Sequence, residues 1–265
     1  MTTSKLLIVN ADDFGFTADV NEGIIEAHRR GIVTSATLMA NGEAFEHAVR
    51  LAQQTPSLDL GAHLTLVGGY SVAQPGIPLP ASPKGLALAL MAGRLHLYQE
   101  CAAQIRKILD AGLRLTHLDT HKHAHLLPPV AEAVGRVSRE FGIPWVRRPL
   151  EAPLAGWLAR RRLRKHGCRM ADHLAGFAET GRLDEDRLLK LVRRIPAGLT
   201  ELLCHPGYCR SELRASPATR LRESRELELV ALTSPAVRQR LEECNVRLVD
   251  FCSVETALGS GSVPD

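Results

Sequence analysis

Short apolar segments alternate with amphipathic segments along most of the chain, and this alternation constrains the fold more than any other feature. Residues 6–10 form a continuous apolar run, which is typical of a strand buried on both faces. Residues 17–30 then predict a helix, because a threonine that can cap a helix opens the segment and a glycine follows it. Strands at residues 32–40 and 58–67, with a helix at 45–54 between them, repeat the pattern. Strands and helices at this interval predict parallel βα units.

The alternation continues almost to the C-terminus and includes no interdomain linker or internal repeat, so we expect one domain over residues 1–265. Further strands are predicted at residues 113–119, 144–148, 172–180, 200–204 and 246–251, and further helices at residues 97–111, 129–141, 184–194, 224–232 and 235–243. The Gly/Pro-rich residues 68–93 interrupt the rhythm as an inserted loop, which is either a functional wall or lid or a plain insertion. The Gly/Ser-rich tail from Gly259 is expected to fray.

Polar residues follow several of the predicted strands at the same end. Asp12 and Asp13 follow the first strand, and His63 lies in or near the end of the third. A histidine-rich stretch follows the fourth strand, and His205 follows the seventh. In a parallel βα barrel the carboxyl ends of the strands face the active site. Four segments that are distant in sequence would therefore place carboxylates and imidazoles on one rim.

The histidine-rich stretch is residues 116–125, Thr-His-Leu-Asp-Thr-His-Lys-His-Ala-His. Four of the 11 histidines in the chain fall within it, and tracts of this kind indicate metal binding. In an extended segment His117, His121, His123 and His125 would share one face. In a helix that begins after Thr120, His121 and His125 would sit at i and i+4. Either conformation brings His121 and His125 to the same side.

The set of side chains suits hydrolysis assisted by a metal ion. One carboxylate and two histidines, with positions left open for water, are a typical catalytic site for a divalent cation. A neighbouring carboxylate can accept a proton from water, and a separate imidazole can protonate a leaving group. Each segment alone also has a structural interpretation: Asp12 and Asp13 could cap a helix, His63 could be a core histidine, and His205 could lie in a turn. Taken together, these separate interpretations are harder to sustain.

Composition excludes several other classes of protein. A net charge of +4 is too small to indicate nucleic-acid binding, and aromatic residues make up only 4% of the chain. The six cysteines include no Cys-x-x-Cys pair. The sequence shows no signal peptide and no apolar run of 18 residues, so we expect a cytoplasmic protein with free thiols and no membrane insertion. The basic run at residues 157–169 could meet an acidic surface, but a solvated helix face is the more economical interpretation.

Several motifs together resemble those of the YdjC-like carbohydrate deacetylases, a family that includes diacetylchitobiose deacetylases and hopanoid-associated deacetylases. The matching segments span most of the chain in order: residues 9–15 (VNADDFG), 31–35 (GIVTS), 61–64 (GAHL), 116–125 (THLDTHKHAH) and 205–208 (HPGY). The resemblance implies an α/β fold, a distorted parallel βα barrel related to the polysaccharide deacetylases. It also implies a hydrolase that removes an acetyl group from an N-acetylated amino sugar or oligosaccharide.

The same resemblance implies a role for each site residue. Asp13, His63 and His121 match the metal ligands, and His125 matches a fourth ligand or a group behind the ligands. Asp12 matches the general base and His205 the general acid. The expected cofactor is one divalent ion, with magnesium or zinc favoured and manganese, cobalt or nickel also compatible with such ligands. The expected partner is a small N-acetylated sugar; a lipid-linked sugar and a homodimer stay open.

Two other functions are compatible with parts of this pattern. A metal-dependent phosphoesterase would favour several metal ions and a cluster of cations at the rim, and only Lys122, Arg147 and Arg148 are placed in the sequence to provide one. A metal-storage or sensor protein would surround the ion with protein ligands and leave Asp12 without a task. The number of ligands and of open positions around the metal would distinguish these alternatives.

Overall fold

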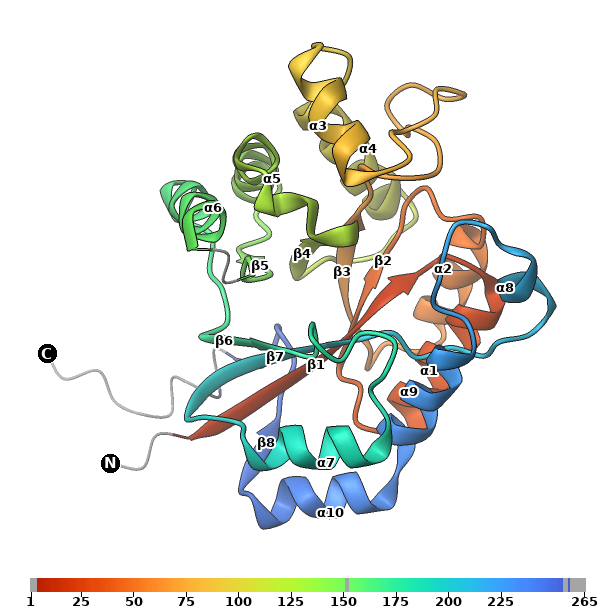
Figure 1. Cartoon of the computed structure of the whole chain (residues 1–265), viewed down its shortest axis with the longest axis vertical. Coiled ribbons are helices and arrows are strands. Elements are labelled where there is room, and N and C mark those ends of the chain that lie inside the picture. Colours follow the sequence, from red (N-terminus) through yellow and green to blue (C-terminus); the bar gives the residue numbers. More distant parts are fainter. Residues whose placement is uncertain (1–3, 151–152, 255–256, 258–265) are drawn as a thin grey trace, which may run out of the picture.

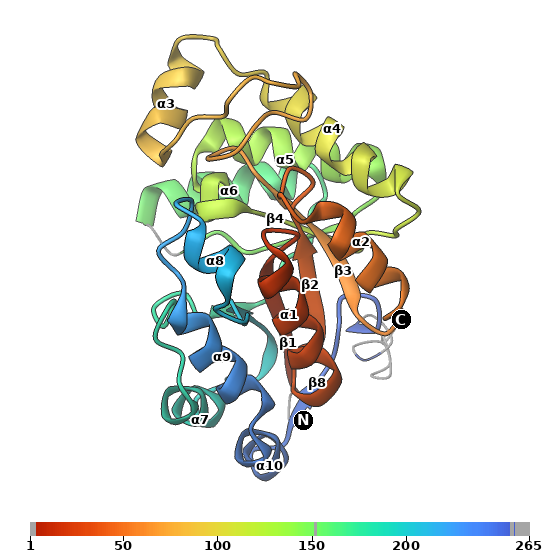
Figure 2. The same cartoon turned by 90° about the vertical axis from the view of Figure 1, so that its right-hand side faces the viewer.

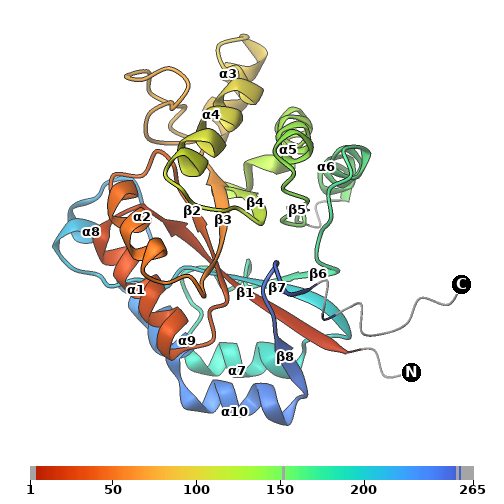
Figure 3. The same cartoon turned by 180° about the vertical axis from the view of Figure 1, so that it is seen from behind.

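The computed structural model describes residues 4–150, 153–254 and 257, and all strands in this part of the chain join one curled parallel sheet (Figure 1). Helices lie along the outer side of the curl, as the view from behind also shows (Figure 3). The order of the strands is β5-β4-β3-β2-β1-β7-β6, and β8 pairs with β1 off this path. The strands are β1 (Lys5–Phe14), β2 (Ser35–Leu38), β3 (Asp59–Leu64), β4 (His117–Thr120), β5 (Trp145–Val146), β6 (His173–Ala175), β7 (Gly198–Cys204) and β8 (Val246–Leu248).

The helices follow the strands in the expected alternation. They are α1 (Ala18–Arg30), α2 (Phe45–Gln53), α3 (Pro83–Met91), α4 (Leu97–Asp110), the 3₁₀ segment η1 (His121–Leu126), α5 (Pro128–Phe141), α6 (Pro153–Lys165), α7 (Glu185–Arg193), α8 (Ser211–Ala215), α9 (Glu223–Thr233) and α10 (Pro235–Glu243). The Thr17 hydroxyl accepts a hydrogen bond from the amide of Val20 and so caps α1 as predicted, and the Ser234 hydroxyl caps α10. Gly142 ends α5 in the left-handed conformation.

The sheet curls because β1 shares one of its edges between two strands. Residues 5–7 of β1 pair with β8, and residues 10–14 pair with β2. The opposite edge of β1 pairs with β7 from Lys5 to Ala11. At the far side of the sheet, an isolated bridge joins Trp145 to Arg169, a few residues before β6. The sheet thus bends back toward itself, and the predicted distorted parallel barrel is confirmed.

The interior of the curl changes from apolar to polar along β1. Leu7, Val9 and Ala11 face the helices and belong to the large core cluster. On the opposite face, Leu6 and Ile8 belong to a second apolar cluster that fills the amino end of the curl. Residues 10 and 12 continue that inner face in an alternating strand, so Asn10 and Asp12 project above the apolar plug. The interior of the curl is therefore apolar at the amino end of the sheet and polar at the carboxyl end.

A middle layer separates the apolar plug from the polar rim. The His117 imidazole stacks on Phe251, with ring centroids 3.9 Å apart, and its Nε2 lies 3.0 Å from the Asn10 side-chain oxygen. Gly61 makes room for this ring, because a Cβ atom at residue 61 would lie 2.5 Å from the imidazole. Burial moves the His117 pKa well below its usual value, so the ring is neutral. His117 therefore has a packing role beneath the site.

The interruption at residues 68–93 has more structure than a plain loop. It contains α3 and an isolated antiparallel bridge between Tyr70 and Pro78. At its base, buried Glu100 accepts hydrogen bonds from the Ser71 hydroxyl and from the amides of Val72 and Ala73. The segment stands beyond α4, away from the centre of the sheet, when the molecule is viewed from the side (Figure 2).

Other boundaries differ from the sequence predictions at particular places. The first strand, predicted for residues 6–10, continues through Asp12 and Asp13 to Phe14. The strand expected at residues 172–180 covers only three residues, and α8 was not predicted because five residues are too few to show a helical period. Every helix in the described part of the chain is too short or too polar to cross a lipid bilayer. The tail from Gly259 lies outside the described residues.

Candidate active site

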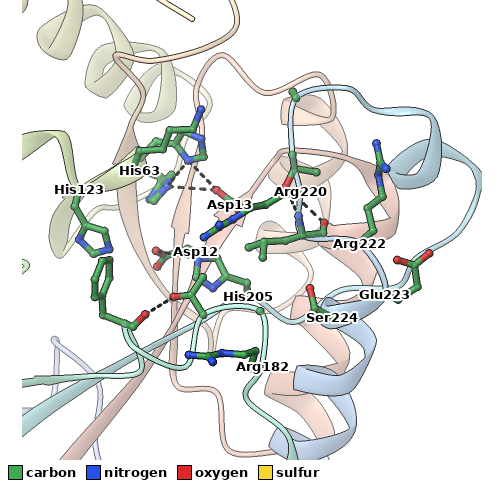
Figure 4. A pocket seen from close by; sticks show the side chains of 18 of the residues that line it. Asp12, Asp13, His63, His123, Arg182, His205, Arg220, Arg222, Glu223 and Ser224 are labelled. Carbon is green, nitrogen blue, oxygen red and sulfur yellow. Dashed lines mark hydrogen bonds and ion pairs between the residues drawn. The ribbon is translucent and has the colours of Figure 1, made fainter. Parts of the chain in front are cut away.

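A local irregularity in β1 brings two adjacent carboxylates to the same site. In a regular strand Asp12 and Asp13 would face opposite sides of the sheet. The pairing between β1 and β2 shifts register between Ala11 and Phe14, and Asp13 adopts a φ of 67°. An aspartate tolerates this left-handed conformation better than most residues, and such bulges turn side chains near active sites. Both carboxylates consequently reach the cavity shown in Figure 4.

Asp13, His63 and His121 form a compact triangle of potential metal ligands (Figure 4). Asp13 Oδ1 lies 3.4 Å from His63 Nε2 and 3.1 Å from His121 Nδ1, and the two nitrogens are 3.2 Å apart. Ligand atoms about 2.1 Å from one divalent ion, at tetrahedral or octahedral angles, are separated by roughly 3.0–3.4 Å. The observed triangle has these edge lengths. Asp13 Oδ1 is also buried without a well-aligned hydrogen bond, as expected for an atom that needs a cation.

Hydrogen bonds behind the triangle orient His63. Its Nδ1 lies 2.7 Å from Asp119 Oδ1, and the hydroxyl of Thr37 donates to Asp119 Oδ2 at 3.1 Å. An Nδ1–H that donates to Asp119 leaves the Nε2 lone pair directed at the triangle. Burial lowers the pKa of His63, but Asp119 and Asp13 outweigh it and raise the pKa to about 10. The surrounding carboxylates therefore favour a positive charge at this position, which a bound cation would supply in place of a proton on His63.

A second group of ligand-type atoms is less suitable for a metal ion. It consists of Asp12, His63 and Asp119, all buried. The guanidinium of Arg147 already lies between its two carboxylates, because Nη1 is 2.7 Å from Asp12 Oδ2 and 2.8 Å from Asp119 Oδ2. A divalent cation at this position would meet the fixed positive charge of Arg147. The Asp13, His63 and His121 triangle is therefore the candidate metal centre.

Asp12 lies beside the triangle and is held by Arg147 rather than by the potential metal ligands. Burial opposes ionisation of Asp12, but the Arg147 guanidinium outweighs burial and keeps the pKa of the carboxyl well below its usual value. Arg147 itself is fully buried, and its Nε lies 2.7 Å from Glu201 Oε1. Asp12 is thus an ionised carboxylate that two hydrogen bonds from Arg147 hold in place.

His205 directly follows β7 and lines the cavity beside Asp12 (Figure 4). Its Nε2 is 3.8 Å from Asp12 Oδ2, and its Nδ1 is 4.0 Å from Glu228 Oε2. The backbone amide of His205 donates a hydrogen bond to Glu228. His205 belongs to neither of the two groups of potential metal ligands found among the described residues.

Helix α9 contributes two positioning residues that were not predicted. Arg225 is buried and donates from Nη2 to Asp13 Oδ2, and Glu228 accepts hydrogen bonds from the amides of His205 and Gly181. Burial raises the pKa of Asp13, but Arg225 and the two histidines lower it well below its usual value. A sequence signal exists: residue 225 opens a stripe of buried positions at i, i+3, i+4 and i+7 of α9. Helix α9 thus holds both Asp13, a potential metal ligand, and the backbone of His205.

The remaining histidines of the tract point in different directions. Lys122 and His123 have φ values of 55° and 51°, which interrupt η1 and remove the expected i, i+4 relation between His121 and His125. His125 is fully buried, its Nδ1 faces the Thr120 hydroxyl, and its Nε2 has no hydrogen-bond partner among the described residues. His125 is outside the triangle, and its role as a fourth ligand stays a prediction.

The site opens into a cavity of about 1140 Å³. The cavity is large enough for a sugar or a short oligosaccharide. Arg147, expected at the rim, is instead buried beneath Asp12. The cationic side chains among the described residues that line the cavity are Lys122, Arg182, Arg220 and Arg222. Of these, only Lys122 was predicted to lie at the rim.

Comparison with known proteins identifies the family of the chain. A family model described as YdjC-like protein matches residues 6–243. The chain belongs to the YdjC-like family. This YdjC-like chain is 34% identical over 257 residues to the carbohydrate deacetylase of Brevibacillus brevis, and the match covers 92% of the chain and 98% of that protein. It is 35% identical over 254 residues to the carbohydrate deacetylase of Geobacillus stearothermophilus, with 93% and 97% covered.

Solved structures share the fold of this YdjC-like chain. A protein of Enterococcus faecalis V583, described as a candidate cellobiose-phosphate cleavage protein, superimposes with a TM-score of 0.82 at 26% identity, over 95% of the chain and 99% of that protein. A variant of the peptidoglycan deacetylase PdaC from Bacillus subtilis gives a TM-score of 0.50 at 9% identity, over 97% and 93% of the two chains. The second likeness concerns the fold alone.

Proposed function

We propose that this YdjC-like protein is a metal-dependent hydrolase that removes the acetyl group from an N-acetylated amino sugar or oligosaccharide. The observation that carries the proposal is the triangle of Asp13, His63 and His121, with Asp12 beside it and the His205 Nε2 3.8 Å from Asp12 Oδ2. The names of the relatives, carbohydrate deacetylases at about one-third identity over nearly the full length, support the same chemistry.

Asp13, His63 and His121 would hold one divalent cation, and Arg225 and Asp119 would keep two of these ligands in place. Such an ion supplies Lewis acidity, which lowers the pKa of water and polarises an acetyl carbonyl. Oxygen and imidazole ligands are compatible with zinc and with magnesium, as well as with other divalent ions.

Asp12 and His205 would move the protons. Asp12 is ionised and fixed by two hydrogen bonds from Arg147, so it can accept the proton of the attacking water. His205 lies within 3.8 Å of Asp12 and can donate a proton to the departing amine. Amide hydrolysis needs both transfers, because water must lose a proton and the amine must gain one before it leaves.

A metal-dependent phosphoesterase is the second candidate, because Arg182, Arg220 and Arg222 line the same cavity and could contact a phosphate. A single triangle of ligands favours the deacetylase, since two-metal phosphoesterases hold their ions about 3.5–4 Å apart with two sets of ligands. A metal-storage protein would leave unexplained why Arg147 holds the Asp12 carboxylate beside the potential metal ligands.

The test is a screen of the purified protein against N-acetylated mono-, di- and lipid-linked sugars and against phosphate esters, with acetate and phosphate both measured. We expect acetate release that is abolished by a chelator and restored by zinc, magnesium, manganese, cobalt or nickel. Full turnover in a verified metal-free preparation would contradict the metal dependence. Release of phosphate without acetate would support the phosphoesterase instead.

A further inference from the structure

We propose that Phe177 forms an aromatic subsite on which a sugar ring of the substrate stacks. This inference rests on the proposed function and names the residue that recognises the sugar rather than its acetyl group. Phe177 lines the same cavity as Asp12, Asp13 and His205, and 46% of its surface is exposed. Among the described residues that line this cavity, it is the one phenylalanine, tyrosine or tryptophan.

The loop after β6 is built to present this side chain. Gly176 has a φ of 89°, and a Cβ atom there would lie 2.2 Å from the carbonyl oxygen of Leu203, so only glycine fits. The Thr180 hydroxyl then donates to the carbonyl of Phe177 at 2.9 Å, and Gly181 donates its amide to Glu228. The loop is therefore tied both to itself and to the helix that supports His205. Phe177 is held at a fixed place relative to the catalytic groups.

A second contact restrains the ring of Phe177. The imidazole of His123 meets it edge to face, with centroids 4.9 Å apart and planes at 88° (Figure 4 shows His123 in the wall of the cavity). His123 reaches this position through the left-handed backbone of residues 122 and 123. Strained backbone of this kind is typical of functional sites. The histidine tract thus supplies one potential metal ligand and, two residues later, the support for an exposed aromatic ring.

A sugar ring is the ligand that fits this wall. One face of a pyranose carries C–H groups, which pack against the electron-rich face of an aromatic ring, while the hydroxyl groups point outward. Arg182, Arg222 and Ser224 also line the cavity and offer hydrogen-bond donors for hydroxyl groups. The contact with His123 covers only part of Phe177, and the exposed remainder lines the cavity, where it is available to stack on a ligand.

The first experiment compares steady-state kinetics of the metal-loaded wild-type protein and Phe177→Ala on an N-acetylated disaccharide and on trifluoroethyl acetate, which has no ring. We expect KM for the disaccharide to rise about 5- to 30-fold, the size expected for the loss of one apolar contact. The kinetics on the ester and the metal content should not change. Phe177→Tyr and Phe177→Trp should restore KM to within about threefold of wild type. Trp157→Ala is the matched control, because Trp157 is 48% exposed on α6 and does not line this cavity.

The second experiment needs no turnover. In a Trp157→Phe background, Phe177→Trp places a reporter in the subsite, while buried Trp145 stays constant. Titration with glucosamine oligosaccharides should change its fluorescence saturably, and titration with acetate should not. An unchanged disaccharide KM in Phe177→Ala, or no saturable change in fluorescence, would overturn the subsite. Failure of the wild type to deacetylate any sugar would overturn the proposed function instead, and sugar binding at residue 177 would still be measured.

Discussion

Arg147 donates a hydrogen bond to Asp12 from each of its two Nη atoms, and each Nη lies 2.7 Å from a different carboxylate oxygen. This fork fixes the plane of the carboxylate as well as its charge. The same guanidinium contacts Asp119, which orients His63, and Glu201, which lies deeper in the curl. One buried cation thus connects the proposed proton acceptor to the residue behind a proposed metal ligand. The geometry of both depends on Arg147.

We expect Arg147→Met to destabilise the protein by about 3–5 kcal/mol, because three buried carboxylates would lose their cation. Arg147→Lys keeps the charge but replaces the planar fork with a single ammonium, so it should fold better and still lose at least tenfold in kcat. Urea unfolding and acetate-release assays measure the two effects. Arg161→Met, on the exposed face of α6, is the control and should cost less than about 1 kcal/mol. A wild-type kcat in Arg147→Lys would contradict the positioning of Asp12.

A second prediction separates metal binding from proton transfer. Asp12→Asn should retain the metal and lose about 10²–10⁴-fold in turnover, the usual contribution of a general base. His63→Ala and His121→Ala should instead lower metal occupancy, because each removes a corner of the triangle. Elemental analysis of the three purified variants, with circular dichroism as a check of folding, makes the comparison. Loss of metal from Asp12→Asn would make Asp12 a ligand and reverse the assignment.

The βα architecture could be predicted because its evidence is local. The first apolar strand, the caps at Thr17 and Ser234, and the glycine after α5 are each visible within a few residues. The convergence of residues 12–13, 63, 121 and 205 could also be predicted, since strands of a parallel sheet end on the same side. Both predictions needed only the periodicity of the chain and the direction of the strands.

The supporting residues could not be predicted in the same way. Arg225 and Glu228 are charged residues on a helix, where exposure is the usual expectation. Their place in the stripe of α9 is a weak signal of burial, and only the tertiary structure shows that they contact Asp13 and His205. The separation of His121 from His125 depends on two left-handed residues that carry side chains, lysine and histidine. Backbone conformations of this kind are imposed by the surrounding fold and leave no clear local signal.

A third prediction concerns pH and Asp59, at the amino end of β3. Burial raises the pKa of this carboxyl from 3.8 to about 6, although the Thr116 hydroxyl and the amide of Phe251 donate hydrogen bonds to it. Because the folded state holds the proton more tightly, the stability linked to Asp59 is present below pH 3.8 and is lost as the pH rises through 6. The loss is at most about 3 kcal/mol.

The measurement is the free energy of unfolding of the wild type and of Asp59→Asn between pH 4 and pH 7.5. Asparagine carries no charge, so the wild type should lose stability relative to the variant as the pH rises. The difference should change mainly between pH 4 and pH 6.5. A difference that is independent of pH across this range would show that Asp59 ionises without penalty in the folded protein.

The last prediction concerns His205, which is mounted on the end of β7 and lies outside the metal-ligand triangle. Its neighbours are Asp12 on one side and Glu228 on the other, so its imidazole can reach the substrate from a different direction than the potential metal ligands. We expect His205→Ala to bind metal normally and to lose turnover, most severely when the leaving group needs a proton. Trifluoroethyl acetate has a leaving group that departs as a stable anion, so its hydrolysis should be spared by comparison.

The decisive quantity is the ratio of variant to wild-type kcat/KM on an N-acetyl sugar, divided by the same ratio on the ester. A quotient well below one is expected of a general acid. Equal losses on both substrates would instead mean that His205 stabilises the developing oxyanion or shapes the cavity, and the role of proton donor would have to pass to another residue.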